Sequence, residues 1–543
     1  MDRSIFIAGT AGEGIQTIGD VIARAFLLHG YSVFATKEYE SRIRGGNNSY
    51  RIRISDQPCN APRHRADVLL ALNPQAADHY ADALSSDGIR LDAEAIPFTK
   101  IAEQMTGERI AANTVAAGAL CAAVGLPVER LNEVLEETFA RKGEDIVKKN
   151  LAAARAGFDQ AQALSSAPLP GQQGTGPNPS YVGAHEIIPI AAAAAGCRFM
   201  AAYPMSPSTG IITALSRDPE LGVLVEQVED EISAINMAIG ASAAGGRAMT
   251  ATSGGGFALM AEAISLAGMI ETPIVVLIAQ RPGPATGLPT RTAQEDLLFA
   301  VRAGHGEFAR AVLAPSDPQD AADLTVRAFE LAERYQTPVL LLTDQYLADA
   351  HFTLPSLSIP QISDDTPDAG DPAAYLRYRL TEDGVSPRRF LGDPEALVSL
   401  DSDEHDEAGH ITEDLATTRP AMVEKRLAKA RHLAMEIKPP ASYRVEDAET
   451  VLIGWGSTRG ALVEAVDRLR GDGQLIGLLH FTEVWPLPAL SFDPKRRYIA
   501  VEGNATGQLA GLLRAEYGVP IDTVIGRTDG LPIDAETLVK ELT

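Results

Sequence analysis

Cysteine, positive charge and long apolar runs are all scarce in this sequence. Its 543 residues include three cysteines, Cys59, Cys121 and Cys197, and no CxxC pair. An iron–sulfur cluster usually needs four thiolates, so we expect reduced thiols and no cluster on this chain. Lys and Arg total 47 against 72 Asp and Glu, and the net charge of −25 argues against a nucleic-acid partner. With no apolar run of membrane-spanning length and no secretory signal, we expect a cytoplasmic protein that does not associate with membranes.

The length and the order of local patterns predict a multi-domain α/β protein. A strand over Ile5–Ala8, a Gly-rich turn and a helix over Ile15–Leu28 open the first domain. A Pro/Gly/Ser-rich stretch without periodicity then reads as a linker. Alternating strand and helix signals next predict a doubly wound parallel sheet, followed by a long charged excursion and a further α/β domain. The expected ranges are 1–164, 165–180 for the linker, 181–352, 353–447 for the excursion and 448–543.

The stretch from Tyr203 to Gly256 carries the most chemical information. It contains a turn-rich YPMSPST, an acidic EDE, a helix of small residues and a short strand that ends in three glycines. Glycines after a strand let a flat ligand approach the backbone closely. The carboxylate of Glu231 opens the small-residue helix. From the residues alone it could be a functional group in a tight apolar setting, or an acid that stabilises the helix N-terminus through the dipole.

These motifs resemble the α subunits of the 2-oxoacid:ferredoxin oxidoreductases, a family of thiamine-diphosphate enzymes. The resemblance rests on YPMSPST, EDEISAINMAIGAS, RAMTATSGGGF and AQRPGPATGLPTRTAQEDLLFA, and it continues through TEDGVSPR, DEHDEAGHITED and VEGNATGQLAGLLR. The N-terminal GTAGEGIQTIGDVIARAF resembles the γ subunit of the same family. The resemblance therefore implies a γ-type domain fused in front of a pyrimidine-binding domain and a transketolase C-terminal-like domain.

The resemblance also implies roles for individual residues. Glu231 becomes the catalytic glutamate, which hydrogen-bonds a ring nitrogen of the aminopyrimidine. Arg281, Thr290 and Ser206 become contacts of the 2-oxoacid, and the Arg281 guanidinium offers a bidentate fork for a carboxylate. Ser206 stands where the family usually has threonine. The implied cofactor contacts are Tyr203, Pro204, Ser253, Gly254 and Asn504. Alternatively, Arg281 pairs with a structural acid and its neighbours are turn residues.

The GTAGEG turn is a weaker signal. A Gly-rich turn that opens a helix can hold a phosphate through backbone N–H groups. The spacing is GxxGxG rather than GxGxxG, so dinucleotide binding is not indicated. The resemblance implies coenzyme A contacts at Gly9, Gly12, Gly14 and Arg42. A tight turn beside a solvated basic loop is an equally strong interpretation.

Two patterns imitate metal sites without matching them. Gly471–Gly473 and Asn504 have the spacing of a magnesium–diphosphate motif, but the glycines follow a helix rather than a strand, which predicts a helix-to-strand turn. His405 and His410 stand among carboxylates at no recognised metal spacing, which predicts a polar surface loop. We therefore expect no metal on this chain. The resemblance places Mg²⁺, the diphosphate site and a 4Fe–4S cluster on a separate β subunit.

As a whole, the resemblance implies an enzyme that converts a 2-oxoacid, coenzyme A and oxidised ferredoxin to an acyl-CoA, carbon dioxide and reduced ferredoxin. The implied substrate is 2-oxoglutarate and the implied product succinyl-CoA. The implied assembly is a dimer of αβ units that share thiamine diphosphate. Pyruvate, branched-chain and aryl 2-oxoacids remain open as substrates. So does a non-catalytic partner that binds coenzyme A or regulates β.

Overall fold

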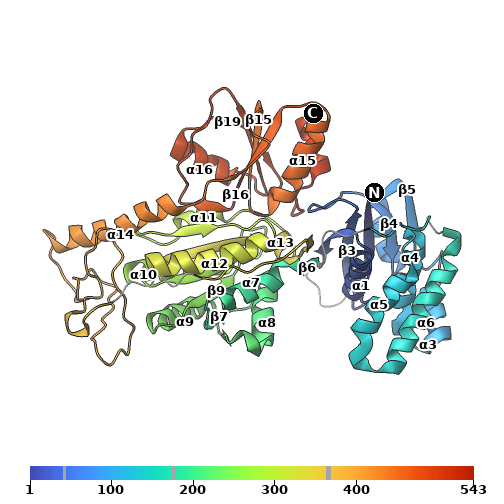
Figure 1. The fold of residues 1–543 in the computed structure, drawn as a ribbon, viewed down its shortest axis with the longest axis horizontal. Coiled ribbons are helices and arrows are strands. Elements are labelled where there is room, and N and C mark those ends of the chain that lie inside the picture. The colour runs from blue at the N-terminus through green and yellow to red at the C-terminus, as the bar shows by residue number, and fades with distance from the viewer. Residues whose placement is uncertain (41–44, 165–166, 173–178, 363–368) are drawn as a thin grey trace. The chain divides into compact units, whose positions relative to one another are not determined.

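Two α/β units make up the chain in the computed structural model (Figure 1). The structure describes residues 1–543 except 41–44, 165–166, 173–178 and 363–368. The first unit comprises Met1–Gly183, Asp349–Leu357 and Asp534–Thr543, and the second comprises Ala184–Ala348 and Ser358–Ile533. Both units are built on sheets that alternate with helices, so the predicted multi-domain α/β class is confirmed.

The first unit contains a mixed seven-stranded sheet in the order β5-β4-β1-β3-β2-β13-β6. Strand β1 pairs in parallel with β4, and β4 with β5, whereas the other neighbours pair antiparallel. The strands are β1 (Asp2–Ala11), β2 (Ser32–Glu38), β3 (Gly45–Ser55), β4 (Ala66–Ala71), β5 (Leu84–Leu91), β6 (Ser180–Gly183) and β13 (His351–Leu354). The expected strand over Ile5–Ala8 is thus the buried centre of β1, paired on both sides.

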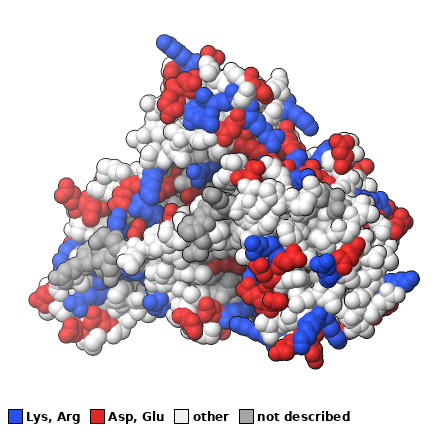
Figure 2. Space-filling model, turned by 45° about the vertical axis from the view of Figure 1, so that its right-hand side comes forward, with Lys and Arg blue, Asp and Glu red and all other residues white. Residues whose placement is uncertain are grey.

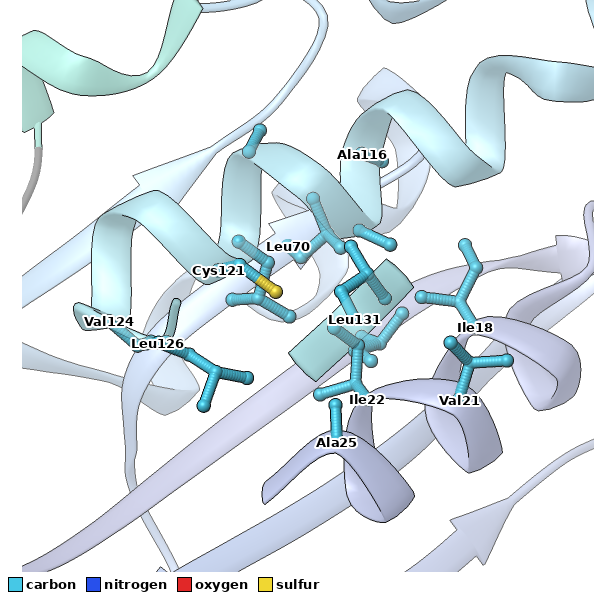
Figure 3. Close-up of a cluster of buried hydrophobic side chains, with 14 of the residues drawn as sticks. Ile18, Val21, Ile22, Ala25, Leu70, Ala116, Cys121, Val124, Leu126 and Leu131 are labelled. Carbon is cyan, nitrogen blue, oxygen red and sulfur yellow. The ribbon is translucent and has the colours of Figure 1, made fainter. Parts of the chain in front are cut away.

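Helices of the first unit bury apolar faces against one another and the sheet. They are α1 (Ile15–Leu28), α2 (Pro74–His79), α3 (Phe98–Thr106), α4 (Ala112–Val124), α5 (Val128–Phe139), α6 (Glu144–Gln160) and α17 (Ala535–Leu542). Figure 3 shows Ile18, Ile22, Cys121 and Leu131, from α1, α4 and α5, pointing into one cluster. Helices α4 and α6 approach so closely that a Cβ at Gly118 would lie 1.9 Å from the Ala154 carbonyl oxygen. The predicted bounds of α1 are confirmed.

The second unit contains a seven-stranded sheet in the order β17-β11-β12-β10-β9-β7-β8. Every neighbouring pair is parallel except β11 with β17. Its strands are β7 (Phe199–Ala202), β8 (Leu224–Gln227), β9 (Ala248–Thr252), β10 (Ile274–Gln280), β11 (Ala311–Leu313), β12 (Pro338–Asp344) and β17 (Glu483–Trp485). The accompanying helices are α7 (Ala184–Ala194), α8 (Thr209–Arg217), α9 (Glu231–Ala243), α10 (Gly254–Met269), α11 (Leu297–Arg302), α12 (Pro318–Tyr335) and α13 (Gln345–Asp349). Parallel sheets of this kind bind their ligands at the carboxyl ends of the strands.

A smaller five-stranded sheet completes the second unit, in the order β14-β16-β15-β18-β19. Figure 1 shows α15 (Arg459–Gly471) and α16 (Gln508–Tyr517) on opposite sides of this sheet. The strands are β14 (Ala441–Tyr443), β15 (Thr450–Trp455), β16 (Ile476–Phe481), β18 (Arg497–Glu502) and β19 (Ile521–Gly526). This sheet is the predicted third α/β element.

The excursion before the small sheet is anchored by buried charge. Its helix α14 (Thr418–Glu436) carries Lys425, whose Nζ lies 2.6 and 2.7 Å from the two carboxylate oxygens of Glu271. Lys429 pairs with the same carboxylate, and Arg377 donates to the Glu271 carbonyl at 2.6 Å. Glu271 lies in the turn between α10 and β10, so the excursion is fastened to the amino edge of the parallel sheet.

The structure divides the chain differently from the expected domain ranges at three places. Strands β6 and β13 lie in the sheet of the first unit, and α17 belongs to that unit as well. Short strands join a sheet through backbone hydrogen bonds, which side-chain periodicity does not reveal. In the expected linker, residues 165–166 and 173–178 lie outside the described residues. The part between them is held to the first unit, where the Leu169 N–H donates to the Gly125 carbonyl.

On the face shown in Figure 2, patches of Lys and Arg alternate with patches of Asp and Glu. Over the part of the chain that the structure describes, no helix combines the length and apolar character needed to cross a bilayer.

Candidate active site

The carboxyl edge of the parallel sheet in the second unit brings most of the predicted site residues together. Tyr203 follows β7, Ser253 follows β9 and Arg281 follows β10. Glu231 begins the helix after β8. Because these strands are parallel neighbours, their carboxyl ends meet at one edge. Segments separated by tens of residues in the chain therefore converge there.

Glu231 is a buried carboxylate that the helix does not use for capping. Its neighbour Asp230 is the N-cap of α9, and the Asp230 side chain accepts the Ser233 N–H at 2.8 Å. Glu231 itself is 3% exposed, and its Oε1 has no hydrogen-bond partner among the described residues. A buried acceptor without a partner is rare in folded proteins and needs an explanation. The alternative in which Glu231 only stabilises the helix end is therefore weakened, because Asp230 performs that task.

The glycines after β9 lie against two acidic side chains. A Cβ at Gly256 would lie 2.4 Å from Glu231 Oε1, and a Cβ at Gly254 would lie 2.5 Å from both oxygens of Asp296. Ser253, at the N-cap of α10, is fully buried, and its Oγ also lacks a described partner. Unpartnered polar atoms thus gather around the first turn of α10, as expected where a ligand supplies the missing hydrogen bonds.

Arg281 and Ser206 are brought into direct contact. The Arg281 Nη1 donates a 2.6 Å hydrogen bond to the backbone oxygen of Ser206, across 75 residues of sequence. Burial lowers the pKa of Arg281, and nearby Asp296 opposes that shift. Arg281 is only half-buried, so further N–H groups of its fork can face a ligand. Thr290 is half-buried further along the same loop and makes no hydrogen bond to Arg281 or Ser206 within the described chain.

Asp296 is a site residue that the sequence patterns did not single out. It precedes α11 but makes no side-chain capping bond, and its buried Oδ2 has no partner among the described residues. Burial raises the pKa of Asp296 to about 6, with a further rise from Glu295 and an opposing effect of Arg281. An acid just before an apolar helix normally predicts an N-cap, so the sequence signal pointed to a structural role.

Tyr203 and Asn504, two of the predicted cofactor contacts, differ in how far their side chains are exposed and hydrogen-bonded. Tyr203 is 40% exposed at the carboxyl end of β7, with Pro204 half-buried beside it. Asn504 is 1% exposed, and its amide is fully engaged. Its Nδ2 donates to Gln294 O and Glu502, while its Oδ1 accepts three backbone N–H groups at the start of α16. These bonds tie the loop after β18 to Gln294, and they occupy both the nitrogen and the oxygen of the Asn504 side-chain amide.

The Gly-rich turn of the first unit already holds a carboxylate. Gly12 and Gly14 adopt left-handed backbone angles, with φ of 95° and 78°. The Thr10 N–H donates to Glu13 Oε2 at 2.7 Å, and the Asn73 side-chain amide donates to the same oxygen at 2.7 Å. Gly9 permits this arrangement, because a Cβ there would lie 2.7 Å from that oxygen. The Thr10 N–H of this turn is thus already occupied by the chain's own Glu13 carboxylate. Arg42 lies outside the described residues.

The two imitations of metal sites have structural explanations. Gly471 ends α15 and Gly473 has φ of 88° just before β16, so the predicted helix-to-strand turn is confirmed. His405 is fully buried, and its ring lies 3.9 Å from that of Tyr378, whereas His410 is exposed. The prediction of a polar surface loop was thus wrong for His405, because this side chain is buried within the excursion, against the ring of Tyr378.

Comparison with known proteins adds independent findings. The family model described as pyruvate flavodoxin/ferredoxin oxidoreductase, thiamine diphosphate-binding, matches residues 190–425, and that of pyruvate ferredoxin/flavodoxin oxidoreductase matches residues 4–160. The chain is 30% identical to a 2-oxoacid:ferredoxin oxidoreductase subunit alpha of a Sulfolobus species, over 100% of this chain and 96% of that protein. It is 31% identical to the 2-oxoglutarate oxidoreductase subunit KorA of Mycobacterium tuberculosis, over 96% and 88%.

One solved structure is similar over the whole length. It is the 2-oxoglutarate:ferredoxin oxidoreductase from Magnetococcus marinus, with 2-oxoglutarate, coenzyme A and succinyl-CoA bound. The TM-score is 0.91 and the identity 32%, and the match covers 100% of this chain and 99% of that one.

Proposed function

The chain belongs to the 2-oxoacid:ferredoxin oxidoreductase family, and from this premise we propose that it binds the aminopyrimidine of thiamine diphosphate together with the 2-oxoacid substrate. The observation that carries this proposal is the buried, unpartnered Oε1 of Glu231 beside Gly256. The chain is an oxidoreductase subunit, and its relatives are named as subunits of larger enzymes.

The residues at the sheet edge fit an aminopyrimidine. Glu231 Oε1 offers a buried acceptor for a ring N–H, and Ser253 Oγ offers a second unpartnered polar atom. Gly256 carries no side chain that would crowd Glu231 Oε1, so this oxygen can accept the ring N–H. When bound, thiamine diphosphate supplies the electron sink for loss of carbon dioxide from a 2-oxoacid. Glu231 holds the ring through its hydrogen bond and sets the proton distribution on it.

Arg281 and Ser206 form the proposed anchor for the substrate carboxylate. One N–H of the Arg281 guanidinium is fixed on the Ser206 backbone oxygen, which orients the remaining donors. A planar guanidinium binds a carboxylate with two parallel hydrogen bonds. Thr290 and the cofactor contacts Tyr203, Pro204, Ser253 and Gly254 remain proposals. Asn504 remains a proposed contact as well, although its side-chain amide is already hydrogen-bonded within the protein.

The proposed reaction converts 2-oxoglutarate, coenzyme A and oxidised ferredoxin to succinyl-CoA, carbon dioxide and reduced ferredoxin. The KorA relative and the Magnetococcus structure, which holds 2-oxoglutarate, coenzyme A and succinyl-CoA, support this choice of substrate. For coenzyme A, Gly9, Gly12, Gly14 and Arg42 stay as proposed contacts. A phosphate there would have to compete with the Glu13 carboxylate for the Thr10 N–H.

A β subunit is the proposed partner. It would supply the diphosphate and magnesium half of the cofactor site, a 4Fe–4S cluster and the route to ferredoxin, in a dimer of αβ units. The three thiols of this chain support that division. All are buried, and burial raises the pKa of Cys121 well above its usual value and that of Cys197 to about 12.

Co-expression tests both proposals. The chain is purified with and without its β subunit, iron is measured in each preparation, and turnover is assayed with 2-oxoglutarate, pyruvate, branched-chain and aryl 2-oxoacids. We expect iron and turnover only with β, and the highest kcat/KM with 2-oxoglutarate. Cluster iron on the chain alone would contradict the partner assignment. Lack of turnover with every 2-oxoacid would favour a non-catalytic role.

A further inference from the structure

The carboxyl group of Asp296 lies within the proposed site and has no structural task. Its backbone N–H donates to Gln280 Oε1 at 3.0 Å, which holds Asp296 near the end of β10. Its carboxyl packs against Gly254, in the first turn of α10, where a Cβ would meet both oxygens at 2.5 Å. The Oδ2 atom is buried and makes no hydrogen bond to any described residue.

Asp344, at the end of the neighbouring strand β12, is a buried acid with a structural role and serves as a comparison for Asp296. Burial also raises the pKa of Asp344 to about 6. However, Asp344 accepts the Leu347 N–H at 2.8 Å and the hydroxyl of Ser457, so its oxygens have partners. Asp296 stands at the N-cap position of α11 and does not cap it. Burial without partners therefore distinguishes Asp296.

The charges that face Asp296 come from two segments. Glu295, its neighbour in the loop, repels the ionised form, and Arg281 after β10 attracts it. The first turn of α10, against which the carboxyl packs, contributes no charge, because it consists of Gly254–Gly256 and Phe257. Arg281 and Asp296 attract each other without forming an ion pair within the described chain. A substrate carboxylate held by Arg281 would bring a new negative charge close to Asp296.

We propose, building on the function proposed above, that binding of the 2-oxoacid is coupled to uptake of one proton from solvent by Asp296. The protonated carboxyl then donates a hydrogen bond from Oδ2 to an oxygen of the substrate held by Arg281. Protonation removes the repulsion between two carboxylates and supplies a donor for a charge-assisted hydrogen bond. Because burial raises the pKa of Asp296 to about 6, this proton is available near neutral pH. It returns to solvent when the site empties.

The test is the pH dependence of KM in the complex with β. Between about pH 5.5 and about pH 8 the carboxyls of 2-oxoglutarate stay ionised. We expect KM for 2-oxoglutarate to rise above about pH 6, by up to about tenfold per pH unit, because the folded enzyme must gain a proton to bind. KM for coenzyme A should not share this slope. Asp296→Asn keeps a neutral donor at every pH, so its KM for 2-oxoglutarate should be flat.

Two further measurements keep the result decisive. Glu262→Gln removes an exposed carboxylate from α10, the helix against which Asp296 packs. This variant should keep the wild-type pH dependence of KM for 2-oxoglutarate. If Asp296→Asn does not fold, a pH-indicator dye can follow proton uptake when the unreactive analogue N-oxalylglycine is added to the wild-type complex near pH 7. A flat wild-type KM, an unchanged slope in Asp296→Asn, or binding of the analogue without proton uptake would overturn the proposal. Absence of 2-oxoacid turnover at every pH would instead refute the proposed function itself.

Discussion

Gly256 lies so close to Glu231 that a methyl group at residue 256 would approach the carboxylate oxygen Oε1 to 2.4 Å. Glu231 begins α9, after β8, and Gly256 lies in α10, after β9. The two strands belong to one parallel sheet, so the helices that follow them begin at the same edge. A side chain at residue 256 would crowd the carboxylate, so the proposed hydrogen bond between Glu231 and a flat ring depends on glycine at this position.

Gly256→Ala should therefore disable the site with little effect on the rest of the fold. The new methyl would also lie 2.1 Å from Thr252 Oγ1, so Glu231 or the helix must shift. Overpacking of this kind costs about 1–3 kcal/mol, and we expect kcat/KM to fall at least about tenfold. Gly255→Ala is the matched control, because its Cβ would meet no atom closer than 3.7 Å. Equal activity of the two variants would show that the Gly256 contact is irrelevant.

Glu231→Gln should keep the fold and lose turnover. The substitution is nearly isosteric, but a neutral amide cannot replace the charged hydrogen bond to the aminopyrimidine. We expect kcat to fall about a hundredfold or more. Glu229→Gln, which neutralises an exposed acid two residues earlier, should behave as wild type. Turnover near the wild-type rate in Glu231→Gln, with thiamine diphosphate bound, would exclude the catalytic assignment.

Arg281→Lys should raise KM for the 2-oxoacid about ten- to hundredfold, the effect of losing one charge-assisted hydrogen bond. Lysine keeps the charge and can still reach the Ser206 oxygen, but it lacks the fork. KM for coenzyme A and the melting temperature should change little. Both Michaelis constants and a thermal melt on one preparation check this. A lower melting temperature with both KM values unchanged would make Arg281 a structural residue.

Glu271→Gln should destabilise the second unit. Burial alone would raise the pKa of Glu271, but Lys425, Lys429 and Arg377 together hold it well below its usual value. Removing the carboxylate leaves buried ammonium groups without a counter-ion, which costs about 3–5 kcal/mol. Since the folded pKa is depressed, the stabilisation is present above about pH 4.5 and declines as the pH falls below it. Urea unfolding at pH 7 and near pH 4 measures both effects.

The stability difference between Glu271→Gln and wild type should therefore be smaller at the lower pH. Glu262→Gln, an exposed change on α10, the helix that ends just before Glu271, serves as the control. An equal stability of Glu271→Gln and wild type at pH 7 would show that the buried cluster contributes nothing to the anchoring of the excursion.

Local patterns in the sequence determined many of the elements and part of the site. The helix over Ile15–Leu28 follows from apolar spacing after a glycine turn, and β10 from a continuous apolar run. Glu231, Ser253 and Arg281 were identified because each lies next to such an element, in a motif that resembles a known family. These helices, strands and adjacent motifs depend on residues that are close in sequence, so they can be predicted without knowing the tertiary structure.

Only the tertiary structure decided which side chains meet. It placed Asp296 against Gly254, filled the Gly-rich turn with Glu13, and engaged both side-chain polar atoms of Asn504 inside the protein. It also moved β6 and β13 into the sheet of the first unit. These relationships join residues far apart in the chain or depend on which hydrogen-bonding groups remain free. The sequence names the groups able to act, and packing determines which of them are left without a partner and thus available for a ligand.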